Sequence, residues 1–285
     1  MRLDGCPALR PDIVSGMRHA LFLPLFDALA EPAVVVRLAA EAEEAGWDGV
    51  FVWDHVSYRA PVTAAADPWI ILAAMACSTE TVRLGPMVTP LPRRRPIKLA
   101  REVTTLDRLS GGRVTLGVGI GGDGAGELSA TGEQLSDKVR GQMLDEGLSV
   151  LQAAWTGEPL THRGEHYTAD GLSLLPTPVQ RPGPPVWVAM RAGNAAPLRR
   201  AARFDGIFPI ELSGPDQLAE IVTDVHAQRA AAGRQGPYDV AVGGPPGADQ
   251  SGFAEAGATW RMAGFSPYGL DVDQVRGVLR EGPQR

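Results

Sequence analysis

The sequence is short of cysteine and of long apolar runs. It holds two cysteines among 285 residues, too few for a disulfide framework, so we expect a reducing compartment and a cytoplasmic protein. Its longest apolar stretch, residues 69–77, has nine residues, whereas a transmembrane helix needs about 18. The sequence therefore predicts no membrane span.

Positive charge is also scarce. Acidic residues outnumber basic ones by 33 to 27, and the formal net charge is −6. Proteins that bind nucleic acid usually present a basic face, so we expect no nucleic-acid partner. Gly (34) and Pro (24) are frequent and predict many turns. Residues 1–16 show no periodic pattern and predict a flexible N-terminal tail, followed by one domain over 17–285.

Within that domain, short β-rich runs alternate with helical patterns. Such alternation implies a parallel sheet, and eight units in a chain of this length predict a single (β/α)8 TIM-like barrel in the α/β class. An open doubly wound sheet is the alternative. A Pro-rich loop after the fourth helix, 156–185, is expected to hold a small β-hairpin. The expected strands are His19–Leu23, Gly49–Trp53, Val82–Gly85, Val114–Val118, Pro185–Ala189, Gly206–Ile210, Tyr238–Val242 and Ala258–Met262.

Asp54 and His55 directly follow the second expected strand. Functional residues of such barrels lie at the C-terminal ends of the strands. A histidine there can move a proton near neutral pH, since its ordinary pKa is about 6.5. The alternative is a capping pair that only closes a loop.

Two motifs match known signatures without the structural context that those signatures need. Residues 117–122 read GxGxxG, but a dinucleotide fingerprint must open directly into a helix. Here 123–136 hold three more glycines and no helical pattern, so we interpret the glycines as backbone that a flat ligand can approach. Residues 162–166 read HxxEH, yet Gly164 favours a hairpin turn over the helix that this zinc motif requires. We expect no metal site.

Two further features are typical of anion binding. Arg93, Arg94 and Arg95 form a basic run that could contact an anionic cofactor tail. Gly193 and Asn194 follow the fifth strand, where free N–H groups at a helix start favour phosphate. The alternatives are a solvated loop for the arginines and a plain helix cap for Asn194.

Several ordered blocks resemble the bacterial luciferase-like monooxygenase family. The resemblance runs from Met17 to about Pro283, and its most specific part is the Leu-Ser-Gly-Gly-Arg to Leu-Gly-Val-Gly stretch. The blocks are Ala42–Gly49, Val52–His55, Asp67-Pro68, Val82–Gly85 with Val88–Pro90, Leu106–Arg113 with Leu116–Gly119, and Phe204–Gly206.

Membership implies a TIM-like barrel, often homodimeric, that binds the deazaflavin F420 or FMN. The pair Asp54 and His55 would flank the cofactor ring, with His55 as acid or base. A non-prolyl cis peptide would join Met87 to Val88 behind the ring. The implied cofactor-binding residues are Met87, Val88, Thr89, Gly119, Ile120, Gly193 and Asn194.

The sequence departs from the family pattern at two places. Pro86 stands where a small residue is usual, and Pro fixes φ and lacks an N–H donor. The acid that some deazaflavin enzymes carry after the fourth strand has no match closer than Asp123. We expect hydride transfer between F420 and a small organic substrate in a homodimer. The alternatives are an FMN monooxygenase that uses O2 with a partner reductase, and a non-catalytic flavin-binding barrel.

Overall fold

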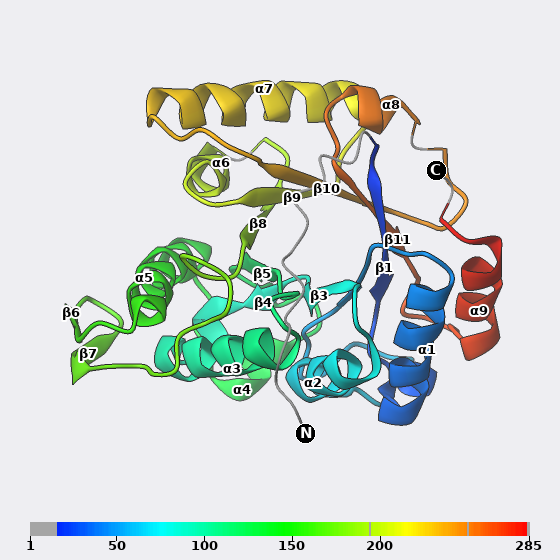
Figure 1. Ribbon diagram of the computed structural model, residues 1–285, viewed down its shortest axis with the longest axis horizontal. Helices are drawn as coiled ribbons and strands as arrows, with labels where there is room; N and C mark the ends of the chain where they lie inside the picture. Colours follow the sequence, from blue (N-terminus) through cyan, green and yellow to red (C-terminus); the bar gives the residue numbers. More distant parts are fainter. Residues whose placement is uncertain (1–15, 194, 250, 284–285) are drawn as a thin grey trace.

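The main sheet consists of parallel strands in the order β3-β2-β1-β11-β10-β9-β8-β5-β4. The structure is a computed structural model that describes residues 16–193, 195–249 and 251–283, so the predicted tail lies almost wholly outside it. Helices cover the outside of the sheet (Figure 1). The strands are β1 (Arg18–Leu23), β2 (Gly49–Val52), β3 (Arg83–Pro86), β4 (Thr89–Pro90), β5 (Leu116–Gly119), β8 (Val186–Arg191), β9 (Gly206–Ile210), β10 (Asp239–Gly244) and β11 (Trp260–Gly264).

The sheet closes into a barrel because β3 and β4 together occupy a single strand position, between β2 and β5. β3 pairs with β2, whereas β4 pairs with β5. Leu84 bridges to the chain just before β5: its N–H donates to the Arg113 carbonyl at 3.1 Å, and its carbonyl accepts from the Thr115 N–H at 3.0 Å. The strands thus occupy eight positions around a barrel. The predicted (β/α)8 barrel is confirmed, and the open-sheet alternative is wrong.

Most helices begin where proline or a capping residue predicts. Pro32, Pro68, Pro96 and Pro215 each occupy a first helical position, where a missing N–H costs nothing. The Asp67 carboxylate accepts from two N–H groups of the first turn, at 2.9 Å each, a cap worth about 1 kcal/mol. The helices are α1 (Pro32–Glu44), α2 (Pro68–Ser78), α3 (Pro96–Leu109), α4 (Glu127–Thr131), α5 (Asp137–Thr156), α6 (Ala195–Ala201), α7 (Pro215–Ala231), α8 (Ser251–Glu255) and α9 (Val272–Glu281).

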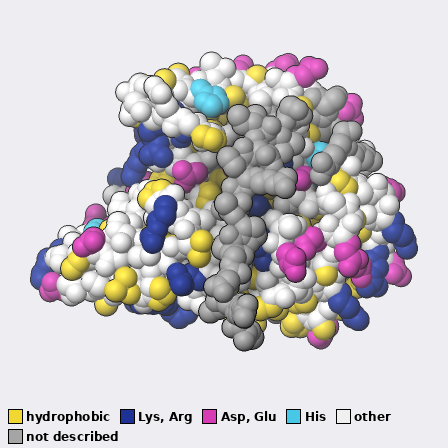
Figure 2. All heavy atoms as spheres, viewed as in Figure 1, with side chains coloured by type: hydrophobic (Ala, Val, Ile, Leu, Met, Phe, Trp, Pro, Cys, Tyr) yellow, Lys and Arg dark blue, Asp and Glu magenta, His cyan; other side chains and the backbone are white. Residues whose placement is uncertain are grey.

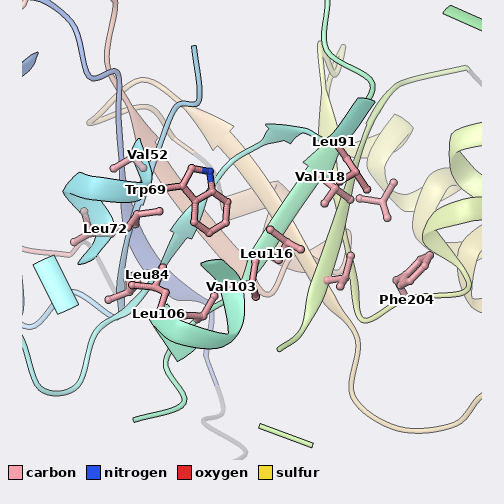
Figure 3. Packing of buried hydrophobic residues seen from close by; sticks show 14 of the residues in the cluster. Val52, Trp69, Leu72, Leu84, Leu91, Val103, Leu106, Leu116, Val118 and Phe204 are labelled. Carbon is pink, nitrogen blue, oxygen red and sulfur yellow. The ribbon is translucent and has the colours of Figure 1, made fainter. Parts of the chain in front are cut away.

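Two apolar shells stabilise the barrel. Alternate strand residues point inward, and the inner cluster is dominated by Phe51, Trp187 and Trp260, all fully buried. The other residues of each strand point outward and pack under the helices, as Figure 3 shows for side chains of α2, α3, β3 and β5. This alternation, which follows from the two-residue period of a strand, leaves the strand ends to form the mouth of the barrel.

Glycine allows the tight approach at the closing seam between β3 and β5. A Cβ on Gly85 would lie 1.8 Å from the Thr115 carbonyl oxygen, and one on Gly117 would lie 2.5 Å from the Pro86 carbonyl oxygen. Pro86 itself is accommodated as the last residue of β3, in register with Val52. One residue further on, the Met87–Val88 peptide is cis, as the family resemblance implies.

Two connections bear on the sequence-based expectations. The hairpin expected in 156–185 is confirmed as β6 (Leu160–Arg163) and β7 (Thr168–Leu172), seen at the left of Figure 1. The HxxEH residues therefore lie on a hairpin and not on a helix. The interpretation of 123–136 as lacking helix is wrong, because α4 forms there after Gly126, whose φ is +74°.

Among the described residues, no helix combines the length and apolar composition required to cross a membrane.

Candidate active site

Asp54 is a buried counter-ion at the C-terminal end of β2. Only 3% of the residue is exposed. Its carboxylate accepts from the Arg93 guanidinium at 2.8 Å and from Arg94 at 2.7 Å. It also accepts from the hydroxyl of Thr89 on β4. The two guanidiniums and the hydroxyl fix this carboxylate, so Asp54 positions its neighbours and is itself closed to a ligand.

His55 is bound by a carboxylate from a short helix that is distant in the sequence. Its Nδ1 lies 2.7 Å from Oε2 of Glu127, the first residue of α4. The other oxygen of Glu127 accepts from the Val56 N–H at 2.6 Å and from the Arg93 guanidinium at 3.0 Å. Arg93 thus joins Asp54 to Glu127, and these side chains with Arg94 and His55 form one set, which we call the carboxylate–arginine network.

The charge state of Glu127 determines what His55 can do. Burial raises the pKa of the Glu127 carboxyl, but the hydrogen bond and charge of His55, the Val56 N–H and the Arg93 charge outweigh burial and lower the pKa overall. Glu127 is therefore an anion at neutral pH. A carboxylate anion can accept hydrogen bonds but cannot donate them. Glu127 therefore selects the form of the His55 imidazole that carries a proton on Nδ1. Nε2 of His55 is left for proton transfer, and 29% of the side chain is exposed.

Three aromatic rings border His55. The ring centroids of Phe26, Trp53 and Tyr58 lie 5.7, 5.8 and 5.1 Å from the imidazole centroid. Phe26 and Tyr58 stack on each other at 4.8 Å, which fixes the loop after β2 over the end of β1. Tyr268 from the loop after β11 approaches Tyr58 at 6.2 Å. The surroundings of the exposed imidazole are thus largely apolar and aromatic.

Several strands carry glycine at or near the end that forms the mouth of the barrel. Gly119 ends β5, and a Cβ there would lie 3.0 Å from Cγ2 of Val88 and 3.8 Å from Cβ of Ala189. Gly243 and Gly264 stand near the ends of β10 and β11. Any side chain at Gly119 would fill the space beside Val88, so the residues present fit a planar ring lying over the mouth.

The structure brings some of the predicted site residues together. Thr89 binds Asp54, and Val88 faces Gly119, as described above. Met87 is 2% exposed and packs inside the barrel, while Ile120 is half-buried at the start of the loop after β5. Gly193 occupies the exposed turn between β8 and α6 with a φ of +84°. Asn194 lies outside the described residues. A cofactor-binding role for these residues stays a prediction.

Glu127 and the role of the arginines were missed by sequence reasoning. Asp123, the nearest acid by sequence, instead accepts from the N–H groups of Leu128 and Ser129 at 2.8 and 3.0 Å and caps α4. The sequence did contain one signal for Glu127. An acidic residue that directly follows a glycine, here Gly126, can be the first residue of a helical turn. Arg93 and Arg94, expected to contact an anionic tail, are held by Asp54 and Glu127.

Most of the sequence matches a known protein family. A family described as luciferase-like monooxygenase matches residues 17–263. An F420-dependent glucose-6-phosphate dehydrogenase of Beutenbergia cavernae is 36% identical over 198 residues, which cover 67% of this chain and 56% of that protein. The oxygenase component of a flavin-dependent trigonelline monooxygenase of Acinetobacter baylyi is 30% identical over 161 residues, or 56% of this chain and 44% of that protein. The chain spans about half the length of these curated relatives.

A solved structure extends the likeness to the whole barrel. An F420-dependent secondary alcohol dehydrogenase, in complex with an F420-acetone adduct, superposes with a TM-score of 0.79. The superposition covers 94% of this chain and 98% of that one, at 20% sequence identity. At that identity the likeness supports the fold alone.

Proposed function

Since the chain belongs to the luciferase-like monooxygenase family of F420- or flavin-dependent oxidoreductases, we propose that it transfers hydride between F420 and a small organic substrate. The observation that carries the proposal is the pairing of His55 with Glu127 at the C-terminal end of the barrel. A hydride that enters or leaves a carbonyl or alcohol carbon is accompanied by a proton on oxygen. This pair has the arrangement needed to move that proton.

The mouth of the barrel would hold the cofactor. Val88 and Ala189 offer apolar contacts to a ring, Gly119 leaves the space for it, and the turn at Gly193 and Asn194 would meet its phosphate. When bound, the deazaflavin or flavin supplies or accepts the hydride, while the protein contributes position and electrostatics.

His55 would act on the substrate oxygen. With a proton held on Nδ1 by Glu127, the free Nε2 takes a proton from an alcohol, or returns one to a carbonyl oxygen once protonated. Glu127 stabilises the imidazolium that forms, because its negative charge lies 2.7 Å from Nδ1. Arg93 keeps Glu127 ionised and oriented through both steps.

The surroundings of His55 favour an apolar substrate over a sugar phosphate. The rings of Phe26, Trp53 and Tyr58 border the imidazole. The guanidiniums of Arg93 and Arg94 are engaged by buried carboxylates and are not available for a phosphate. We therefore infer an alcohol or carbonyl compound with a hydrocarbon body, in contrast to the substrate named for the Beutenbergia relative.

F420 is preferred to FMN on two grounds. The 36% identical relative is F420-dependent, and a histidine with a carboxylate suits proton transfer coupled to hydride transfer. The alternative is an FMN monooxygenase supplied by a reductase, as the trigonelline relative is an oxygenase component. A homodimer also stays a prediction.

The test is a fluorescence and absorbance titration of the apo-protein with F420 and with FMN, followed by turnover with secondary alcohols and glucose 6-phosphate. The proposal expects F420 to bind at micromolar concentration or below, and F420 reduction by an apolar alcohol. FMN binding alone with oxygen uptake would support the monooxygenase. Binding of neither cofactor would refute both enzymatic alternatives.

A further inference from the structure

Arg140 is a buried cation at the end of the first turn of α5. Figure 2 shows basic side chains at the surface near α5 and α6, but Arg140 is only 3% exposed. The ion pair that it forms is with Asp137, whose own side chain is 76% exposed. The positive end of a helix dipole also disfavours a cation in the first turn. Neither solvation nor helix stability therefore accounts for a guanidinium at this place.

The guanidinium binds backbone carbonyls at both ends of one loop. Its Nε donates to the Ile120 carbonyl at 3.1 Å, directly after β5. Its Nη1 donates to the carbonyls of Gln134 and Leu135 at 2.9 and 2.5 Å, just before α5. We call residues 120–135 the Glu127 loop. A planar guanidinium presents its N–H donors in a fixed fork, which lets one side chain join the two ends of this loop.

The Glu127 loop has little else in its own sequence to fix it. All of its residues are described by the structure, and only Glu127 and Leu128 are buried. A segment with so few buried contacts opens easily. Asp123 caps α4 from within the loop, but Asp123 is exposed to solvent. Arg140 is thus a buried tie from outside the loop that holds both of its ends.

We propose that Arg140 is a positioning residue of the active site. By joining the two ends of the Glu127 loop, it fixes the start of α4 and keeps the Glu127 carboxylate against Nδ1 of His55. Its hydrogen bonds go to the loop and to Asp137, so it acts on His55 through Glu127. The expected effect on turnover rests on the proposed function, whereas the effect on the His55–Glu127 pairing does not.

The first test therefore needs no cofactor. NMR of isotope-labelled apo-protein would follow the Nδ1 proton of His55, which the hydrogen bond to Glu127 protects from exchange with water. The His55→Gln variant identifies the signal, because it removes it. Arg140→Lys keeps the charge but loses the fork, and we expect the Nδ1 proton to exchange about 10-fold faster as the loop opens more often.

Arg200→Lys is the matched control. Arg200 is 6% exposed and also binds α5, through the Gly141 carbonyl at 3.0 Å and the Asp145 carboxylate at 2.7 Å. It thus loses a guanidinium of similar burial from the same helix, with no printed contact to the Glu127 loop altered. Both variants should unfold at a lower temperature than the wild type. Only Arg140→Lys should change the exchange of the His55 proton.

The second test is a double-mutant cycle on kcat at saturating cofactor and substrate. Arg140→Lys should lower kcat about 5- to 10-fold in the wild-type background. In the Glu127→Gln background the same change should lower kcat by less than about 2-fold, because the carboxylate that Arg140 positions is already absent. A merely structural role of Arg140 would lower kcat equally in both backgrounds.

The outcomes separate this proposal from the proposed function. Unchanged exchange of the His55 proton in Arg140→Lys, or equal losses of kcat in both backgrounds, would overturn the positioning role. If Arg140→Lys does not fold, Arg140→Met carries the same expectation, because its side chain fills the space without burying a charge. Faster exchange in a protein that shows no F420 turnover would refute the proposed function and still support the positioning of Glu127 by Arg140.

Discussion

His55 and Glu127 stand 72 positions apart in the chain, yet Nδ1 of the histidine lies 2.7 Å from Oε2 of the glutamate. The loop after β2 supplies the histidine, and the short helix after β5 supplies the carboxylate. The Val56 N–H and the Arg93 guanidinium hold the other oxygen. A base oriented by a fixed carboxylate is the arrangement that general acid–base catalysis requires.

Replacing Glu127 by glutamine should slow turnover by roughly 10-fold or more without releasing the cofactor, because glutamine cannot stabilise an imidazolium. Steady-state kinetics at saturating cofactor would measure the fall in kcat. Glu158→Gln, at an exposed glutamate, is the control. A kcat unchanged from the wild-type value would reduce Glu127 to a structural residue.

Acid should weaken the wild-type protein more than the Glu127→Gln variant. The pKa of Glu127 is lowered in the folded protein, so its stabilising effect is present above the ordinary carboxyl pKa of about 4.3 and is lost as pH falls through the lower folded value. Urea unfolding at pH 7 and at pH 3.5 measures the difference. The difference in free energy of unfolding between the two proteins should be larger at pH 7 than at pH 3.5. A difference that grew in acid would contradict a lowered pKa for Glu127.

Asp54→Asn should destabilise the fold strongly. The Asp54 side chain is 1% exposed. Its loss leaves Arg94, 20% exposed, without its counter-ion and leaves Arg93, 8% exposed, with Glu127 alone. Breaking a buried pair in this way costs about 3–5 kcal/mol. Asp170→Asn breaks the Arg163 pair, in which both side chains are more than 65% exposed, and should cost less than about 1 kcal/mol. If denaturant titrations showed similar losses of stability for the two variants, the role of Asp54 as a buried counter-ion would be refuted.

The closing seam of the barrel should not tolerate a methyl group. Gly85→Ala places Cβ 1.8 Å from a backbone oxygen and should cost more than about 3 kcal/mol or prevent folding. Gly277→Ala is the comparison, because Gly277 lies in α9 with no atom within 4 Å of the added Cβ. It should stabilise the protein by about 0.5–1 kcal/mol. A soluble Gly85→Ala protein with the wild-type Tm would contradict the observed seam.

The fold was largely predictable because its signals are local. Pro32, Pro68 and Pro96 mark helix starts, and Asp67 caps α2 through hydrogen bonds within its own first turn. Strand ends were predicted to within a few residues, since both faces of these strands are buried and their sequences read as short apolar runs. Eight such units in one domain leave few arrangements other than a barrel.

The partner of His55 was not predictable because it depends on tertiary contact. Glu127 lies in a glycine-rich stretch, where no periodicity indicates α4, and only the closed barrel brings it to the loop after β2. The arginine run was ambiguous for the same reason. Sequence shows three adjacent cations, whereas in the structure Arg93 and Arg94 pair with buried carboxylates and Arg95 is exposed.

The most direct test of the central claim is the turnover of His55→Ala at matched cofactor occupancy. Wild-type and variant protein would be saturated with F420, occupancy would be confirmed by fluorescence, and F420 reduction by the best alcohol substrate would be followed by absorbance. The account predicts unchanged F420 affinity and a fall in kcat of about 10²- to 10⁴-fold, as expected for loss of a general acid–base. A variant that binds F420 and keeps full turnover would contradict the assignment of His55.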